Sequence, residues 1–157
     1  MAHEFKTQRR VTFADTDCAG IAHFSGFFRY MEDAEHEFLR SLGLSVQHKS
    51  EDGSVVGFPR VSAHCEFSRA VRFEDVVDIH LWLSGRRKSV LEYSFRLSRE
   101  GQEVAIGELV VIACRVTPDH APEVVDLPAP FADQLEVAPY GPLEFRSRTG
   151  KQSGGDS

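Results

Sequence analysis

Apolar residues recur along the chain with two different periods. Between Phe24 and Leu42 they return at steps of three and four residues, which predicts one long amphipathic helix that ends at Gly43. Residues 5–13 alternate apolar and polar positions, as a strand does, and residues 45–54 form a polar loop. Beyond that loop, alternation at period two predicts four strands. Their inward-facing positions are expected to be Val61, Ala63, Cys65 and Phe67; Val77, Ile79, Leu81 and Leu83; Leu91, Tyr93, Phe95 and Leu97; and Val104, Ile106, Val110, Ile112, Cys114 and Val116, with Glu108 interrupting the last row.

The order of these elements predicts the fold class. Strands that alternate in this way are antiparallel and have one covered face, and the long helix is the natural cover. We therefore expect an α+β fold in one domain, which suits a length of 157 residues. The domain is expected to span residues 1–138. Residues 139–157 are polar and end in a glycine-rich stretch, which predicts a disordered tail that does not pack.

Composition and charge narrow the possible functions. The chain has 18 Lys and Arg against 24 Asp and Glu, a net charge of −6, so nucleic acid is not expected as a ligand. It lacks an apolar run long enough for a membrane span. The first residues have no apolar signal segment, and three widely spaced cysteines do not suggest a disulfide framework. These features favour a cytoplasmic protein.

Several common catalytic motifs are absent from the sequence. Neither of the glycine-rich phosphate loops, GxxxxGK[ST] and GxGxxG, is present, and neither is the GxSxG elbow of serine hydrolases. His36 and Glu37 begin a zinc-binding HExxH motif, but Arg40 stands where its second histidine would be. We therefore expect no catalytic metal ion.

The segment from Asp15 to Gly26, which joins the first strand to the helix, carries the candidate chemistry. The N-terminus of a helix exposes unpaired amides, which suit a carbonyl oxygen that becomes anionic. A carboxylate just upstream could attack that carbonyl or activate water against it. Asp15 and Asp17 could instead have only a structural role, in Asx turns and in capping the helix. Taken alone, the pattern favours this structural role, and Asp15 in particular is expected to shape the loop.

Two long stretches are similar to a known family. RVTFADTDCAGIAHFSGFFRYMEDAEHEFLRSLGL resembles the opening of the 4-hydroxybenzoyl-CoA thioesterase family of hotdog-fold acyl-CoA thioesterases, and PRVSAHCEFSRAVRFEDVVDIHLWLSGRRKSVLEYSFRL resembles its later part. The resemblance covers residues 6–137. It implies a long central helix wrapped by a five- to six-stranded antiparallel sheet. It also implies hydrolysis of an acyl-CoA to a free acid and coenzyme A, with no metal or organic cofactor.

The resemblance assigns roles to individual positions of the loop. It makes Asp17 the nucleophile or general base, and the backbone amide of Phe24 the oxyanion donor. It makes Gly20 the residue that lets the acyl chain approach the backbone closely. Relatives often carry Tyr or His at the position of Phe24, so the neighbouring His23 is a further catalytic candidate. His23 could orient Asp17 or a water molecule, or it could make only a loop hydrogen bond.

A basic turn is the candidate site for the nucleotide of coenzyme A. Arg86, Arg87 and Lys88 are consecutive in an acidic chain, and coenzyme A carries phosphates that need such groups. An exposed turn attracts charged residues anyway, so a solvated role is an equal alternative. Arg69 and Arg72 are weaker candidates for the same contacts.

The hotdog resemblance also bears on assembly. One sheet wrapped around one helix leaves an edge strand unpaired, so we expect a homodimer at least and a homotetramer by resemblance. Two other functions remain open. The His23-Phe24-Ser25-Gly26 segment is faintly similar to that of hotdog hydratases and dehydratases acting on acyl thioesters, and the protein could also bind an acyl thioester without hydrolysing it. The sequence does not indicate the acyl group.

Overall fold

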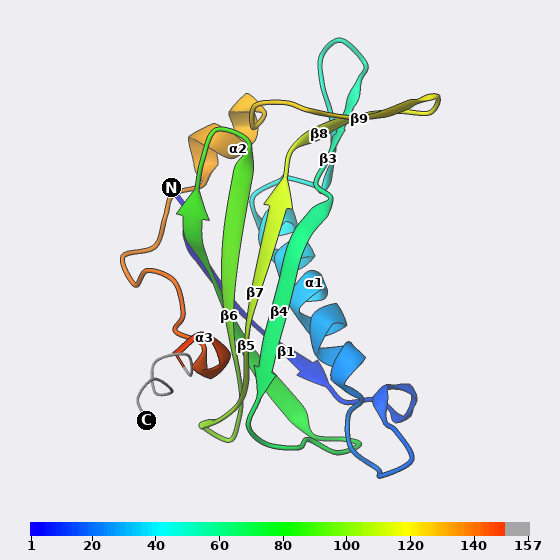
Figure 1. The fold of residues 1–157 in the computed structure, drawn as a ribbon, viewed down its shortest axis with the longest axis vertical. Helices are drawn as coiled ribbons and strands as arrows, with labels where there is room; N and C mark the ends of the chain where they lie inside the picture. The colour runs from blue at the N-terminus through cyan, green and yellow to red at the C-terminus, as the bar shows by residue number, and fades with distance from the viewer. Residues whose placement is uncertain (150–157) are drawn as a thin grey trace, which may run out of the picture.

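One antiparallel sheet and one long helix organise residues 1–149, which are the residues described by this computed structural model (Figure 1). The five strands of the sheet lie in the order β1-β5-β6-β7-β4. They are β1 (Glu4–Arg10), β4 (Arg60–Phe67), β5 (Val76–Arg86), β6 (Val90–Arg99) and β7 (Gln102–Ile112). The expected α+β architecture, with its antiparallel sheet, is confirmed.

A smaller sheet, which the sequence patterns did not predict, projects from one end of the molecule (Figure 1). Its strand order is β2-β3-β8-β9. These strands are β2 (Gln47–Lys49), β3 (Val55–Gly57), β8 (Cys114–Thr117) and β9 (His120–Val124). The remaining elements are the 3-10 helix η1 (Phe13–Asp15) and the short helices α2 (Ala129–Gln134) and α3 (Arg146–Thr149).

Helix α1 (Phe24–Ser41) forms where the three- and four-residue spacing of apolar positions predicted it. Its apolar face, which includes Phe27, Met31 and Phe38, is buried against the sheet. The helix contacts β1, β4 and β5. No helix within residues 1–149 has the length and apolar character needed to cross a membrane.

The inward-facing rows are confirmed for two strands and wrong for two others. The predicted apolar positions of β5 and β6 are all buried. In the predicted row of β7 and the strand after it, only the positions Val104 and Cys114 are buried as expected. Between them the buried row is shifted by one residue: Ala105, Leu109 and Val111 are buried, and Ile106 and Val110 lie half-buried on the other face. The two small residues Ala105 and Gly107 leave room for α1, whereas the larger apolar side chains lie on the outer face. The prediction chose the row with the larger apolar side chains, and in the middle of β7 that row lies on the outer face.

Strand β4 is an edge strand, and its predicted inward row is wrong for that reason. Val61 and Phe67 are 59% and 47% exposed, Ala63 is exposed, and only Cys65 is half-buried. In residues 1–149, β4 has a neighbouring strand on the β7 side only. The apolar side chains of β4 therefore form surface rather than core.

A buried ion pair connects α1 to the start of β4. Glu35 is fully buried in the middle of the helix, and its Oε2 lies 2.5 Å from Nη2 of Arg60. Nη1 of Arg60 donates to Oε1 of Glu35 at 3.0 Å, and Nη2 also donates to Glu32 at 3.3 Å. Burial raises the pKa of Glu35, although Arg60 opposes that effect. A single arginine thus holds a carboxylate that would otherwise be costly inside the protein.

Residues after 138 fold back over the outer face of the sheet, so the expectation of an unpacked tail is wrong for residues 140–147. Phe145 is 1% exposed and meets the ring of His64 edge-to-face at 4.6 Å between centroids. The amides of Arg146 and Ser147 donate to the carboxylate of Glu66, at 2.7 and 2.9 Å. The buried Phe145 ring and the two backbone hydrogen bonds to Glu66 therefore hold this segment against the sheet, although its composition is polar. The rest of the expected tail, residues 150–157, lies outside the described residues.

Candidate active site

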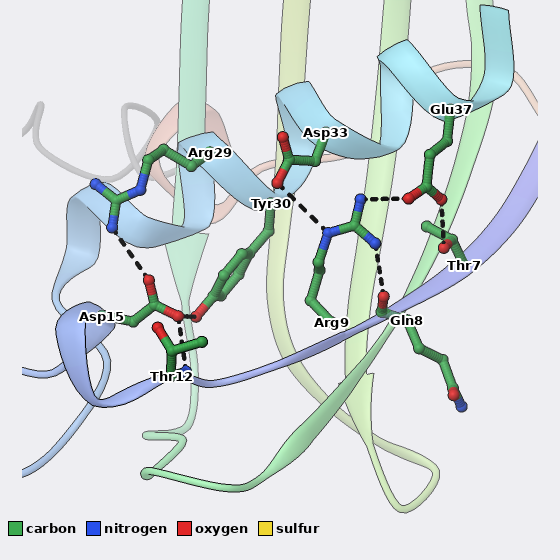
Figure 2. Close-up of polar contacts among 9 residues, drawn as sticks. All are labelled: Thr7, Gln8, Arg9, Thr12, Asp15, Arg29, Tyr30, Asp33 and Glu37. Carbon is green, nitrogen blue, oxygen red and sulfur yellow. Dashed lines mark hydrogen bonds and ion pairs between the residues drawn. The ribbon is translucent and has the colours of Figure 1, made fainter. Parts of the chain in front are cut away.

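The loop between β1 and α1 is fixed by the first of its two aspartates (Figure 2). Oδ2 of Asp15 accepts hydrogen bonds from the Thr12 amide at 2.9 Å and the Tyr30 hydroxyl at 2.8 Å. Oδ1 accepts from Arg29 at 3.3 Å. Partial burial raises the pKa of Asp15, but these hydrogen bonds outweigh it and leave the pKa below its ordinary value. Asp15 therefore shapes the loop, as expected.

The second aspartate keeps part of its carboxylate available. Oδ1 of Asp17 accepts the amides of Ala19 at 2.8 Å and Ile21 at 3.4 Å, which is an Asx-type turn. The structure assigns no hydrogen-bond partner to Oδ2 within residues 1–149. Gly20 closes this turn with a φ of +77°, in the left-handed region that favours glycine. Gly20 is not among the residues lining the cavity beside Asp17, so its geometry accounts for the glycine without a substrate contact.

Helix α1 begins with one backbone amide left open. His23 is the N-cap, and its Nδ1 accepts the Ser25 amide at 3.3 Å and lies 2.8 Å from the Ser25 hydroxyl. The Gly26 amide donates to the His23 carbonyl at 2.9 Å. The Phe24 amide has no acceptor among the described residues. A ligand oxygen could therefore accept a hydrogen bond from this amide, at the positive end of the helix.

Asp17, His23 and Phe24 face the same cavity, of about 440 Å³. The cavity lies between the loop, the start of α1 and the end of β4. The other lining residues are Ile21, Ala22, Phe27, Phe67, Ser68, Arg69 and Ala70. The structure thus brings together the three residues that the sequence singled out for catalysis. An aspartate with a free oxygen, an open helix amide and apolar walls can support acyl transfer.

Aromatic rings form much of the cavity wall. Phe67 meets Phe27 at 5.1 Å between centroids, nearly perpendicular, and His23 lies against Phe24 at 4.5 Å. Sequence reasoning missed Phe27 and Phe67 as site residues, because it assigned both to the core. The signal that could have found Phe67 is its place at the end of a strand, directly before the polar Ser68-Arg69 pair.

The basic turn is not brought to this cavity. Arg86, Arg87 and Lys88 lie between β5 and β6 at the α2 end of the sheet, whereas the Asp17 loop lies at the opposite end (Figure 1). Each of the three also has a partner in the chain: Arg86 donates to the Leu135 carbonyl, Arg87 pairs with Glu92, and Lys88 pairs with Asp126. Within one chain the basic turn therefore lies away from the cavity, and its binding of the coenzyme A phosphates stays a prediction.

Arg69 and Arg72 lie much nearer to the site. Arg69 lines the cavity, and its Nη1 donates only to the Glu103 carbonyl, at 3.2 Å. The guanidinium of Arg72 lies beside Gly20, 3.9 Å from the position of a Cβ there. No carboxylate pairs with either side chain within residues 1–149. One cation without a carboxylate partner among the described residues therefore lines the cavity, and a second stands on the residue that bridges to the cavity-lining Ile21.

Comparison with known proteins agrees with this geometry. Residues 11–135 match the family model described as the Thioesterase-like superfamily. The chain is 32% identical over 108 residues to a 1,4-dihydroxy-2-naphthoyl-CoA hydrolase of Synechococcus sp. (strain WH7803), covering 65% of this chain and 71% of that protein. It is 30% identical over 94 residues to the 4-hydroxybenzoyl-CoA thioesterase of Pseudomonas sp. (strain CBS-3), covering 59% and 67%.

A solved structure extends the similarity to the fold. A gentisyl-coenzyme A thioesterase aligns with a TM-score of 0.71 and 25% identity, over 82% of this chain and 99% of that one. This agreement confirms the hotdog thioesterase fold that the resemblance implied. The family match includes the Asp17 loop, all of α1 and all strands of the main sheet except β1. The chain therefore belongs to the thioesterase-like superfamily.

Proposed function

We propose that the protein hydrolyses an aromatic acyl-CoA to the free acid and coenzyme A. The observation that carries this proposal is that one cavity is lined both by Asp17, whose carboxylate keeps a free oxygen, and by Phe24, whose amide has no acceptor among the described residues. In the proposed reaction the thioester oxygen accepts a hydrogen bond from the Phe24 amide, which stabilises the negative charge that develops on it. The family assignment supports thioester hydrolysis as the reaction class.

Asp17 supplies the base or the nucleophile. As a base, its free oxygen takes a proton from water while the water oxygen bonds to the acyl carbon. As a nucleophile, the same oxygen bonds to that carbon first, and water then hydrolyses the acyl-aspartate anhydride. In either route the C–S bond breaks and the sulfur leaves as a thiolate, which takes up a proton. The residue assignment is the same for both, and neither step uses a metal or organic cofactor.

The aromatic acyl group is supported by the walls of the cavity. Phe24, Phe27 and Phe67 offer ring edges and faces to a flat acyl group. The relatives described above are named for naphthoyl, hydroxybenzoyl and gentisyl thioesters, all of which are aromatic. Arg69 and Arg72 are proposed to bind the nucleotide phosphates of coenzyme A, because Arg69 lines the cavity, Arg72 bridges to the cavity-lining Ile21, and neither has a carboxylate partner among the described residues.

A second copy of the chain is proposed to complete the site. The open edge of β4 carries exposed Val61 and Phe67, and Phe13, Phe24 and Phe73 are exposed nearby on the loops and helix start. An unpaired edge strand next to exposed aromatic side chains is typical of an interface. Pairing through β4 would cover these residues and close the wide cavity from the other side.

The experiment is a thiol-release assay with a panel of benzoyl-type, short aliphatic and long aliphatic coenzyme A thioesters. We expect the highest kcat/KM for the aromatic substrates and unchanged activity after chelation. Asp17→Asn should bind substrate but lose at least ~10²-fold in kcat, the scale of a lost acid–base group. An Asn variant within a fewfold of the wild type would contradict the role of Asp17. Hydration of the acyl chain without thiol release would instead identify a hydratase, and binding without either product a binding protein.

A further inference from the structure

Tyr30 lies outside the cavity but is bonded to the loop that carries Asp17 (Figure 2). It stands on α1, six residues after Phe24, and is 4% exposed. Its hydroxyl donates to Oδ2 of Asp15 at 2.8 Å. Burial and the neighbouring Asp15 carboxylate raise the pKa of Tyr30, so the hydroxyl keeps its proton as a donor. A buried tyrosine on the helix therefore holds the beginning of the loop.

The contact extends from Asp15 to both reacting groups. The Asp15 carbonyl accepts the amide of His23 at 2.8 Å, and His23 is the cap from which the helix begins at Phe24. Asp17 follows Asp15 by two residues, and its amide donates to the Ile21 carbonyl at 2.8 Å. The loop is therefore closed on itself by backbone hydrogen bonds, and the carboxylate of Asp15 attaches it further to the body of α1 through Tyr30 and Arg29.

We propose that Tyr30 is a positioning residue that sets the separation between the Asp17 carboxylate and the Phe24 amide. The proposal rests on the function proposed above, because it assumes that these two groups act on one carbonyl. Asp17 stands on the loop and Phe24 on the helix, so the buried Tyr30–Asp15 bond, which ties the loop to the helix body, constrains the distance between them. Misplacement of a reacting group by about 1 Å can lower a rate by roughly 10²-fold.

The hydroxyl can be removed without changing the packing of the ring. Tyr30 meets Phe27 edge-to-face at 5.8 Å, a contact that phenylalanine would keep. Asp15 would also keep its bonds from Thr12 and Arg29. Tyr30→Phe is therefore expected to fold and to free only one attachment of the loop.

The same helix offers a matched control. Thr7 on β1 donates its hydroxyl to Glu37 on α1 at 2.6 Å, which is again a hydroxyl-to-carboxylate bond between α1 and the segment before it (Figure 2). Glu37 lies seven residues further along α1 than Tyr30, about 10 Å further from the site at 1.5 Å per residue. Thr7→Val removes this hydroxyl with little change of shape.

Steady-state thiol release separates positioning from stability. We expect Tyr30→Phe to lower kcat tenfold or more with KM within about threefold of the wild type, and Thr7→Val to leave kcat within about twofold. A kcat of Tyr30→Phe within about threefold of the wild type would overturn the proposal. So would an equal fall of kcat in both variants, because it would show a general effect on the helix.

Hydrogen exchange gives a readout that needs no substrate. In Tyr30→Phe, amides of residues 15–24 should exchange at least several times faster than in the wild type, and in Thr7→Val they should not change. Unchanged exchange in Tyr30→Phe would refute the positioning role whatever the assay shows. If the wild type releases no thiol, the proposed function fails, and exchange alone then decides whether Tyr30 holds the loop.

Discussion

Two aspartates that stand two residues apart in the chain have opposite surroundings. Both oxygens of Asp15 are occupied by Thr12, Tyr30 and Arg29, so a substrate would have to displace protein groups to reach them. Asp17 lines the cavity and has one oxygen in a turn, while the other has no hydrogen-bond partner among the described residues. The residue type alone does not distinguish them. What separates them is the number of donors that the fold has already directed at each carboxylate.

Gly107 of β7 gives a prediction about the core. A Cβ at this position would overlap with the sulfur of Met31, which is fully buried on α1. Gly107→Ala should therefore lower the free energy of unfolding by about 1–3 kcal/mol, the usual cost of overpacking. Urea denaturation of the purified variant measures it.

The same substitution in a Met31→Ala background provides the control. There the extra methyl group enters vacated space, so its cost should fall by at least half. An equal cost in both backgrounds would show that helix and strand do not meet at this point.

At the scale of elements, a buried charge pair joins α1 to the start of β4, and the contact of Phe27 with Phe67 joins the same two elements at the other end of the strand. Arg60→Met leaves Glu35 buried without its main partner, and we expect a loss of about 3–5 kcal/mol at pH 7. Without Arg60, burial alone raises the pKa of Glu35. A raised pKa in the folded state means that stability is retained at low pH and lost as the pH rises through it. The deficit of the variant should therefore shrink as the pH falls from 7 to 5.

A double variant tests this explanation. Glu35→Gln combined with Arg60→Met carries no buried charge, so its stability relative to Arg60→Met should be higher at pH 7 and should show less dependence on pH. Denaturation series at several pH values give both quantities. A deficit of Arg60→Met that grows on acidification would contradict a buried carboxylate as its cause.

We expect the arginines in the loop after β4 to bind coenzyme A, and the basic residues in the turn after β5 not to bind it within the same chain. Arg69→Gln together with Arg72→Gln should raise KM for an acyl-CoA about tenfold with little change in kcat, and should leave the acyl-pantetheine analogue unaffected. Charge-assisted contacts of about 1.5–3 kcal/mol each, reduced by exposure, account for that scale.

The matched control replaces Arg87 and Lys88 by Gln, since both are exposed and their partners in the chain are Glu92 and Asp126. KM for the same acyl-CoA should stay within about twofold. If only this control raises KM, the basic turn of a second copy binds the nucleotide and the role of Arg69 and Arg72 is refuted.

The elements also show how far sequence patterns reach. The periodicity of α1 and the inward rows of β5 and β6 were predictable, because each buries one face only. In β7 both faces carry apolar residues, and the helix selects the face with Ala105 and Gly107 for space. Local chemistry pointed to the segment between Asp15 and the start of α1, but only the family resemblance singled out Asp17 and the Phe24 amide, and their roles stay predictions. The wall at Phe67 had only a weak sequence signal, its place before the Ser68-Arg69 pair, because its exposure depends on which strand forms the sheet edge.

At the scale of the whole molecule, the open edge of β4 predicts a homodimer or a homotetramer. Val61 on β4 and Val124 on β9 are similarly exposed, at 59% and 56%. Val61→Asp should shift the protein towards monomer and lower activity, whereas Val124→Asp should do neither. Sedimentation at the assay concentration measures the first effect. A wild type that is fully active as a monomer would contradict a shared site.

The segment that folds back over the sheet brings the end of the described chain to the catalytic half of the molecule. Glu66, which receives the amides of Arg146 and Ser147, directly precedes Phe67 of the cavity wall. The N-terminus lies at the other end of β1, where the Ala2 amide donates to the Gln134 carbonyl. The two ends are therefore not equivalent attachment points for engineering. A fusion partner or surface linkage at the N-terminus would stand away from the cavity, whereas a bulky domain joined directly after α3 would start beside Glu66 and Phe67 at the cavity wall.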